Sequence, residues 1–257
     1  MPRPRFESSR EQIAHAYNAL VDKGYFTDRF GGNERYLGRL MLHHIPAKAH
    51  SILEIGGATG LWMHQVLRRR PAMREVTIVE ISAAAETCRD RLSRTLHDRP
   101  GSRLDVIRAD FLDVKDELPQ AQVVASSFVA EYMGDPATYV RALYDLAEPG
   151  GRVVFIDVLT RPDSPAGSIG PRPVLASFAR LCLAYVKAGR IPPLIGVARA
   201  LPLYRFPSEP AFQALYEDYT ATYDFPRAAW IATQREYPGA EFLDLGMAGL
   251  LMVPKPE

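Results

Sequence analysis

A glycine-rich turn directly after a short apolar stretch constrains this chain more than any other feature of its sequence. Residues 52–60 read Ile-Leu-Glu-Ile-Gly-Gly-Ala-Thr-Gly, so an apolar strand that carries an acid runs into a turn with three glycines. Glycine allows positive backbone φ angles and lets a ligand approach the main chain without meeting a Cβ atom. The segment therefore predicts a turn that holds a nucleotide-like ligand. A tight connection after a buried strand would use the same residues, so this alternative stays open.

Two common nucleotide-binding motifs do not fit this turn. Counted from Gly56, the dinucleotide-binding pattern G-x-G-x-x-G requires glycine where the chain has Ala58 and Leu61. A phosphate-binding P-loop requires Lys and then Ser or Thr after its last glycine, whereas Leu61 and Trp62 follow Gly60. The sequence therefore disfavours both a dehydrogenase and triphosphate chemistry.

An acid follows the next predicted strand. Residues 76–79 are mostly β-branched, which predicts a short buried strand, and Glu80 and Ile81 come directly after it. Glu80 follows Gly56 at close to the spacing of about 20 residues at which a nucleotide-binding unit places its ribose-binding carboxylate. Glu80 is therefore a candidate ribose ligand, with a solvated acid at a strand end as the alternative.

A third acid occupies the corresponding place after the strand predicted at 104–107. Asp110 and Phe111 follow that strand as a carboxylate beside an aromatic ring. The carboxylate could accept a hydrogen bond from an adenine amine, and the ring could pack near the base. The alternative is an Asp that caps a helix in front of a core Phe.

The remaining apolar runs complete an alternating pattern of strands and helices. Helical spacing between the runs supplies the crossover helices that parallel strands require. A Pro-Gly-Gly turn at 149–151 precedes the fifth strand. The sequence predicts an α/β, Rossmann-like fold, with a seven-stranded, mostly parallel sheet and helices on both faces. The other predicted strands cover residues 123–128, 152–157, 241–245 and 249–253.

The 257 residues, 47% of them hydrophobic, suit one domain with an elaboration. We expect residues 1–44 to form an N-terminal helical lid, 45–160 the ligand-binding core, 161–238 a helical cap between strands five and six, and 239–257 the last two strands. Prolines break the cap region into short helices and turns. Aromatic side chains that could line a pocket there or fill the cap's own core are Phe178, Tyr185, Tyr204, Phe206, Phe212, Tyr216, Tyr219 and Tyr223.

The pattern E-x-G-x-A-x-G at 54–60 resembles the first motif of the class I S-adenosylmethionine-dependent methyltransferases. The acids after the second and third strands and the Pro-Gly-Gly turn are similar to later features of that family. A fainter resemblance, partly through Ser127-Phe128, is to quinone-biosynthesis C-methyltransferases. The resemblance implies S-adenosylmethionine as cofactor and a small-molecule acceptor. The implied cofactor-binding residues are Glu54, Gly56, Gly57, Ala58, Gly60, Glu80, Ile81, Asp110, Phe111, Ser127 and Phe128.

A sulfonium methyl donor carries its own leaving group, so such an enzyme mainly aligns acceptor, methyl and sulfur and excludes water. Where many O-methyltransferases of the family place a histidine shortly after the fourth strand, this chain has Glu131. Glu131 could take a proton or steady positive charge if burial raises its pKa. It could instead be a helix acid favoured by the macrodipole. Tyr17 is a second catalytic candidate.

The resemblance leaves three functions open. The first is methyl transfer to oxygen or carbon of a small aromatic, quinone-like or polyketide-like metabolite. The second is methylation of a small amine. The third is a methyltransferase-fold protein that binds the cofactor without methylating, as a cyclase or a partner subunit. In each case, we expect Gly56→Val to abolish cofactor binding by placing a branched side chain where the ligand must lie.

Charge and cysteine content narrow the partners and the compartment. The formal net charge is +1 with no evident basic groove, so we expect no nucleic-acid partner. Cys88 and Cys182 lie far apart in no C-x-x-C arrangement, which predicts free thiols, a cytoplasmic location and no disulfide. No segment reaches the roughly 18 uncharged apolar residues of a membrane span. The histidines at 43, 44 and 50 lack metal-ligand spacing, so we expect no metal. The sequence leaves open whether the protein forms a homodimer.

Overall fold

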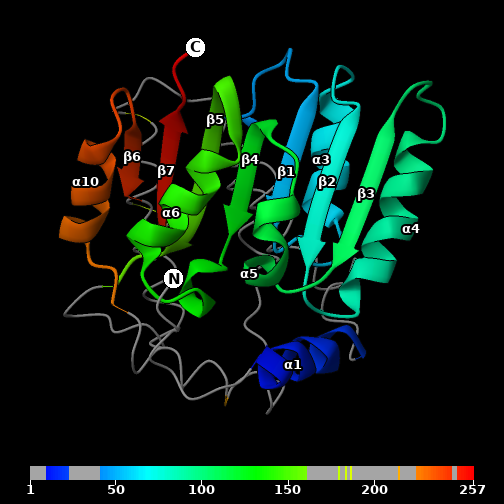
Figure 1. Cartoon of the computed structure of the whole chain (residues 1–257), viewed down its shortest axis with the longest axis horizontal. Coiled ribbons are helices and arrows are strands. Elements are labelled where there is room, and N and C mark those ends of the chain that lie inside the picture. Colours follow the sequence, from blue (N-terminus) through cyan, green and yellow to red (C-terminus); the bar gives the residue numbers. More distant parts are fainter. Residues whose placement is uncertain are drawn as a thin grey trace.

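In the computed structural model, one seven-stranded sheet forms the centre of the protein (Figure 1). The structure describes residues 10–22, 41–160, 224–244 and 248–257, and four single helical residues at 179, 183, 186 and 214. The strand order is β3-β2-β1-β4-β5-β7-β6, and β7 alone runs opposite to the other strands. The strands are β1 (Ser51–Ile55), β2 (Glu75–Glu80), β3 (Arg103–Arg108), β4 (Ala121–Ser127), β5 (Ala147–Val158), β6 (Glu241–Asp244) and β7 (Ala248–Pro254). The predicted fold class is confirmed.

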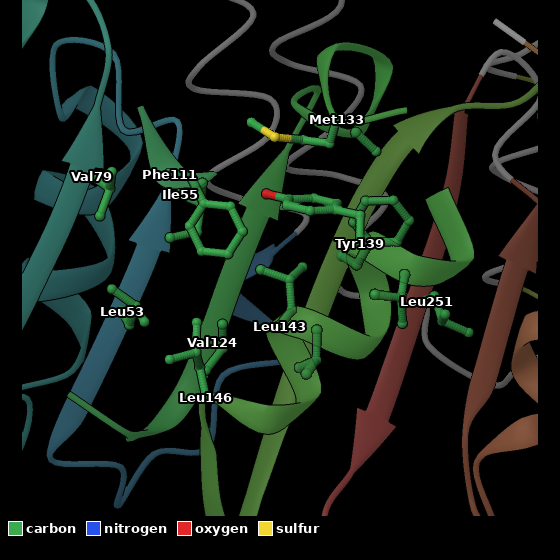
Figure 2. Packing of buried hydrophobic residues seen from close by; sticks show 14 of the residues in the cluster. Leu53, Ile55, Val79, Phe111, Val124, Met133, Tyr139, Leu143, Leu146 and Leu251 are labelled. Atoms are coloured by element: carbon green, nitrogen blue, oxygen red, sulfur yellow. The ribbon is translucent and has the colours of Figure 1, made fainter. Parts of the chain in front are cut away.

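Helices cover both faces of the sheet, because the strand residues alternate between two apolar clusters. Leu53 and Val124, which are paired in register, face a cluster that includes residues of α5, α6 and α10, and Figure 2 shows part of it. Their neighbours Ile52 and Val123, also paired, face a second cluster with residues of α3 and α4. The helices are α1 (Arg10–Asp22), α3 (Leu61–Arg69), α4 (Ala84–Leu96), α5 (Phe111–Val114), α6 (Pro136–Asp145) and α10 (Arg227–Glu236), with 3-10 turns η1 (Lys115–Glu117) and η2 (Ala130–Tyr132).

The Pro-Gly-Gly turn lies inside β5 and not in front of it, which corrects the predicted start of this strand. Ala121 pairs with Ala147, whereas Val123, two residues later, already pairs with Arg152. Residues 148–151 therefore bulge out of the ladder between these two pairs. The sequence alone placed the turn before the strand because a Pro-Gly-Gly run more often ends an element than interrupts one.

Residues 224–238, predicted as the end of the cap, cover the sheet. Trp230 of α10 is fully buried and stacks on Phe155 with ring centroids 5.1 Å apart and on Phe242 at 5.4 Å. The cap predicted over 161–223 lies outside the described residues apart from single positions. None of the helices that the structure describes is long and apolar enough to cross a membrane.

Candidate active site

The candidate site lies where the order of the strands reverses. From β1 the chain adds β2 and β3 on one side, whereas β4 and β5 lie on the other side. In open α/β sheets the ligand binds beyond the carboxyl ends of the strands at such a switch point. Here the glycine turn follows β1, and η2 follows β4. The sheet therefore brings the predicted cofactor residues after β1, β2, β3 and β4 to one edge.

Gly56 has a φ of +81°, a left-handed conformation that favours glycine. Its N–H donates to the carbonyl of Val79 at 2.8 Å, which ties the turn to the end of β2. A Cβ atom at Gly56 would lie 2.3 Å from Cγ2 of Val129. The space beside Gly56 is therefore filled by a side chain of the protein. This corrects the expectation that a side chain here would lie in the place of the ligand.

The other residues of the turn are also packed against the protein. A Cβ atom at Gly57 would lie 2.2 Å from Cγ2 of Ile78, and one at Gly60 would lie 2.7 Å from Sγ of Cys88. Ala58 has a φ of +42°, which costs about 1–2 kcal/mol for a residue with a Cβ atom. The glycines thus let the turn lie flat against β2 and α4, and Ala58 accepts strain at the one position of the pattern that lacks glycine.

Glu80 connects the end of β2 to the glycine turn. Its Oε2 accepts the N–H of Ala58 at 2.8 Å, and its Oε1 accepts both the N–H and the hydroxyl of Ser82, at 2.8 and 2.6 Å. The side chain is buried, with 5% of its surface exposed. Each carboxylate oxygen has two lone pairs, so Oε2 keeps capacity for a further donor. Ile81, which is half-buried, follows at the same edge.

Glu54 lies beneath the turn. It is fully buried in β1, and its Oε2 would be 3.5 Å from a Cβ atom at Gly57. The acid of the E-x-G pattern is therefore directly under the main chain of the turn that follows it.

After β3, the structure separates the roles of the two predicted residues. Asp110 is half-buried and caps α5, because its Oδ1 accepts the N–H of Leu112 at 2.8 Å. The Phe111 ring is buried in the core, edge-on to Tyr139 with centroids 5.6 Å apart (Figure 2). The expectation that this ring packs near a base is not met, because the ring packs inside the apolar core. Phe111 can face the site only through its main chain.

The chain after β4 makes a strained turn at the centre of the site. Ser127, the last residue of β4, and Phe128 are both half-buried, and Phe128 has a φ of +55°. A bulky residue in this conformation is a genuine outlier. The N–H of Phe128 donates to the carbonyl of Ile156 at 2.9 Å, which fixes the turn to β5. The main chain of Glu131 lies in η2, whereas its side chain is not among those described.

Tyr139, below the same edge, is a structural residue. Its hydroxyl lies 2.8 Å from Oγ of Ser126, and the side chain is fully buried. Burial raises the pKa of the phenol, and the nearby negative charge of Asp157 adds to this, against the hydrogen bond to Ser126. The hydroxyl therefore stays protonated and does not act as a base.

Helix α1 lies below the carboxyl ends of the strands in Figure 1 and contacts segments on both sides of the glycine turn. The Tyr17 hydroxyl lies 3.1 Å from the Tyr132 hydroxyl of η2, with the rings edge-on. The adjacent Asn18 accepts the N–H of Ala83, at the start of α4, through its Oδ1 at 2.6 Å. One helix thus contacts both the β4 and the β2 side of the candidate site.

From the resemblance to the methyltransferases, Asn18→Ala is expected to weaken binding of S-adenosylhomocysteine by about 3–10-fold, because a neutral hydrogen bond contributes about 0.5–1.5 kcal/mol. The lost bond holds Ala83, which directly follows the Ser82 that binds Glu80. Calorimetric titration measures the effect, with His15→Ala, an exposed residue on α1, as the matched control. Equal affinities for the two variants would show that the Asn18 contact of α1 does not contribute to cofactor binding.

The sequence did not single out Asn18, Ser82 or Val129 as site residues. Ser82 had a local signal, since a hydroxyl two residues after an acid can bind the carboxylate. Asn18 and Val129 had none, because their contacts depend on how α1 and the β4 turn meet the glycine turn.

A sheet of this order, with an acid-flanked glycine turn at its switch point, is typical of α/β proteins that bind nucleotide-like ligands. The family model described as a methyltransferase domain matches residues 11–193, more than half of the chain. The chain belongs to this methyltransferase family, as the resemblance of its first motif indicated. No curated protein sequence matches it.

Several solved structures share the fold. An O-methyltransferase family protein from Burkholderia thailandensis has a TM-score of 0.51 at 17% identity, covering 85% of this chain and 55% of that one. The mitomycin 7-O-methyltransferase MmcR has a TM-score of 0.54 at 17% identity, with coverages of 96% and 61%. PigF with SAH has a TM-score of 0.53 at 17% identity, with coverages of 97% and 63%. The chain therefore spans less than two thirds of the length of these proteins.

Proposed function

We propose that the protein is an S-adenosylmethionine-dependent methyltransferase that acts on oxygen or carbon of a small aromatic, quinone-like or polyketide-like metabolite. The observation that carries the proposal is the glycine turn at the switch point, with its Ala58 N–H bound to the carboxylate of Glu80. Membership of the methyltransferase family supports the reaction, and the solved structure of PigF with SAH supports the cofactor. The described residues fit the cofactor, since its ribose hydroxyls suit a buried carboxylate.

The cofactor would supply an electrophilic methyl group on a positively charged sulfur. Glu80 would hold the ribose, and the main chain of the glycine turn would lie along the rest of the ligand. Asp110 and Ile81 would contact the base. Helix α1, held by its two contacts, would cover the site and keep water out. This matters because water competes with the acceptor and weakens electrostatic interactions.

On the acceptor side, Tyr17 and Glu131 are the proposed catalytic residues. Tyr17 contacts Tyr132, the residue next to Glu131, so both candidates belong to one region around η2. A phenolic hydroxyl there can orient an acceptor oxygen by hydrogen bonding, and a carboxylate can take its proton. For a phenol or an enol-like carbon, this proton must leave as the new bond to methyl forms.

Methyl transfer is tested with purified protein, S-adenosylmethionine labelled in its methyl group, and panels of phenols, quinones and β-keto compounds beside a panel of small amines. The proposal predicts a labelled product and an equal amount of S-adenosylhomocysteine with an oxygen or carbon acceptor. Product from amines alone would favour N-methylation. Cofactor binding without any S-adenosylhomocysteine across all panels would favour a protein that binds the cofactor without methylating.

Glu131→Gln is expected to slow methyl transfer by about 10²–10⁴-fold, the usual range for loss of a general base, and to leave cofactor affinity unchanged. Turnover of the best acceptor and titration with S-adenosylhomocysteine measure the two effects. Glu117→Gln is the matched control, since Glu117 is an exposed acid in the other 3-10 turn, η1. A Glu131→Gln rate equal to that of the control would show that Glu131 is not a catalytic base and has a structural role.

A further inference from the structure

Asp157 in β5 is a carboxylate with no exposed surface. Its Oδ2 accepts the N–H of Val129 at 3.1 Å and that of Ala130 at 2.8 Å, and its Oδ1 accepts the N–H of Val158 at 2.7 Å. Burying a charge costs several kcal/mol unless hydrogen bonds replace its water. Two of these three bonds cross from β5 to the turn after β4. The buried charge therefore fixes that turn.

The turn that Asp157 holds is the strained one. Val129 and Ala130 are the N-cap and first residue of η2, and they directly follow Phe128 with its φ of +55°. A conformation of this kind costs on the order of 1–3 kcal/mol and persists only where neighbouring contacts impose it. The bonds to Asp157, with the bond from Phe128 to Ile156, supply that constraint.

The same strained turn supports the glycine turn of β1. Val129 Cγ2 would lie 2.3 Å from a Cβ atom at Gly56, so its side chain fills the space beside this glycine. The main chain from Ala130 leads into Glu131 and Tyr132, on the acceptor side of the site. A continuous series of contacts therefore runs from Asp157 through Val129 to Gly56, across β5, β4 and β1.

We propose that Asp157 is a positioning residue of the active site, whose buried carboxylate fixes the turn at 128–132 against both the cofactor and the acceptor. This inference rests on the proposed function, because it assigns the glycine turn to the cofactor. In the proposed role Asp157 contacts neither the cofactor nor the acceptor. It acts through the two N–H groups at the start of η2 and through the Val129 side chain.

The test replaces Asp157 with asparagine, which keeps the shape but places an NH2 group or a weaker acceptor opposite the donors. Asp157→Asn is expected to weaken binding of S-adenosylhomocysteine by about 10-fold or more, as charge-assisted hydrogen bonds are lost. Amide hydrogen exchange of Val129 and Ala130 is expected to accelerate in the same variant. Asp135→Asn is the control, because Asp135 accepts the N–H of Thr138 as the exposed N-cap of α6.

Val129→Ala provides a second variant in case Asp157→Asn does not fold. It leaves the carboxylate and its bonds in place but removes the packing beside Gly56, and about 3-fold weaker binding of S-adenosylhomocysteine is expected. Unchanged affinity or unchanged exchange at Val129 and Ala130 in Asp157→Asn would overturn the inference. If Asp157→Asn does not fold, unchanged affinity in Val129→Ala would overturn it.

Amide exchange separates this inference from the proposed function. If wild-type protein does not bind S-adenosylhomocysteine, the proposed function fails and the assignment of a cofactor to this turn fails with it. Faster exchange at Val129 and Ala130 in Asp157→Asn would then still show that the carboxylate fixes the turn. If wild-type protein binds and Asp157→Asn binds equally well, the function stands and only the positioning role is lost.

Discussion

Gly56→Val is expected to raise the dissociation constant for S-adenosylhomocysteine by more than about 100-fold. The left-handed backbone costs a residue with a Cβ atom about 1–2 kcal/mol, and overpacking adds about 1–3 kcal/mol. The clash is with Val129, whose Cγ2 would lie 2.3 Å from the new Cβ atom, so the glycine turn must shift away from its place beside β4. Calorimetric titration of the variant measures the loss.

Three further variants separate the clash from the backbone strain. Gly101 has a φ of +77°, but a Cβ atom there would meet nothing closer than Arg74 Nη1 at 3.8 Å. Gly101→Val therefore carries the strain without the clash and is expected to bind normally. Adding Val129→Ala to Gly56→Ala is expected to recover part of the affinity that Gly56→Ala loses. Normal binding by Gly56→Val would show that the glycine turn is not part of the cofactor site.

Glu80→Gln is expected to weaken binding of S-adenosylhomocysteine by about 10–100-fold, since hydrogen bonds to a charged group contribute about 1.5–3 kcal/mol. The carboxylate accepts from Ala58 and from Ser82 through different oxygens. Glutamine offers one acceptor oxygen, so its NH2 group must face one of these donors. The variant therefore loses the ribose ligand and disturbs the turn at the same time.

Glu75→Gln is the matched control for this change. Glu75 is the first residue of the same strand, β2, and is exposed at the far end from the site. Titration of both variants under one condition compares an acid at each end of one strand. If Glu80→Gln bound as tightly as Glu75→Gln, Glu80 would be a strand-end acid without a ligand.

The sequence predicted the sheet because the signals for its strands are local. The apolar runs at 52–55 and 76–79 appear as the buried strands β1 and β2, and the glycine turn between β1 and α3 lies where the pattern places it. The predicted start of β5 was wrong because the bulge at 148–151 depends on contacts with neighbouring segments. The N–H of Lys255 donates to the carbonyl of Gly151 at 2.8 Å, a contact more than a hundred residues apart in sequence.

Side-chain roles at the site were harder to predict, because they depend on which face of an element meets a neighbour. Phe111 follows an acid after a strand, as a base-packing ring would, but the short α5 turns the ring into the core. Asn18 and Asp157 act on main-chain N–H groups of distant residues, Ala83 and Val129. Such bonds leave no spacing in the sequence.

The most direct test of the cofactor assignment is calorimetric titration of the full chain with S-adenosylmethionine and S-adenosylhomocysteine, with NAD as the control ligand. The glycine turn, Glu80 and the family predict binding of the first two with dissociation constants on the order of micromolar, and no heat from NAD. Absence of binding by both methyl-transfer ligands would contradict the assignment and leave only the α/β fold and the family match, without a cofactor. Binding of NAD in their place would restore the dehydrogenase interpretation that Ala58 and Leu61 argue against.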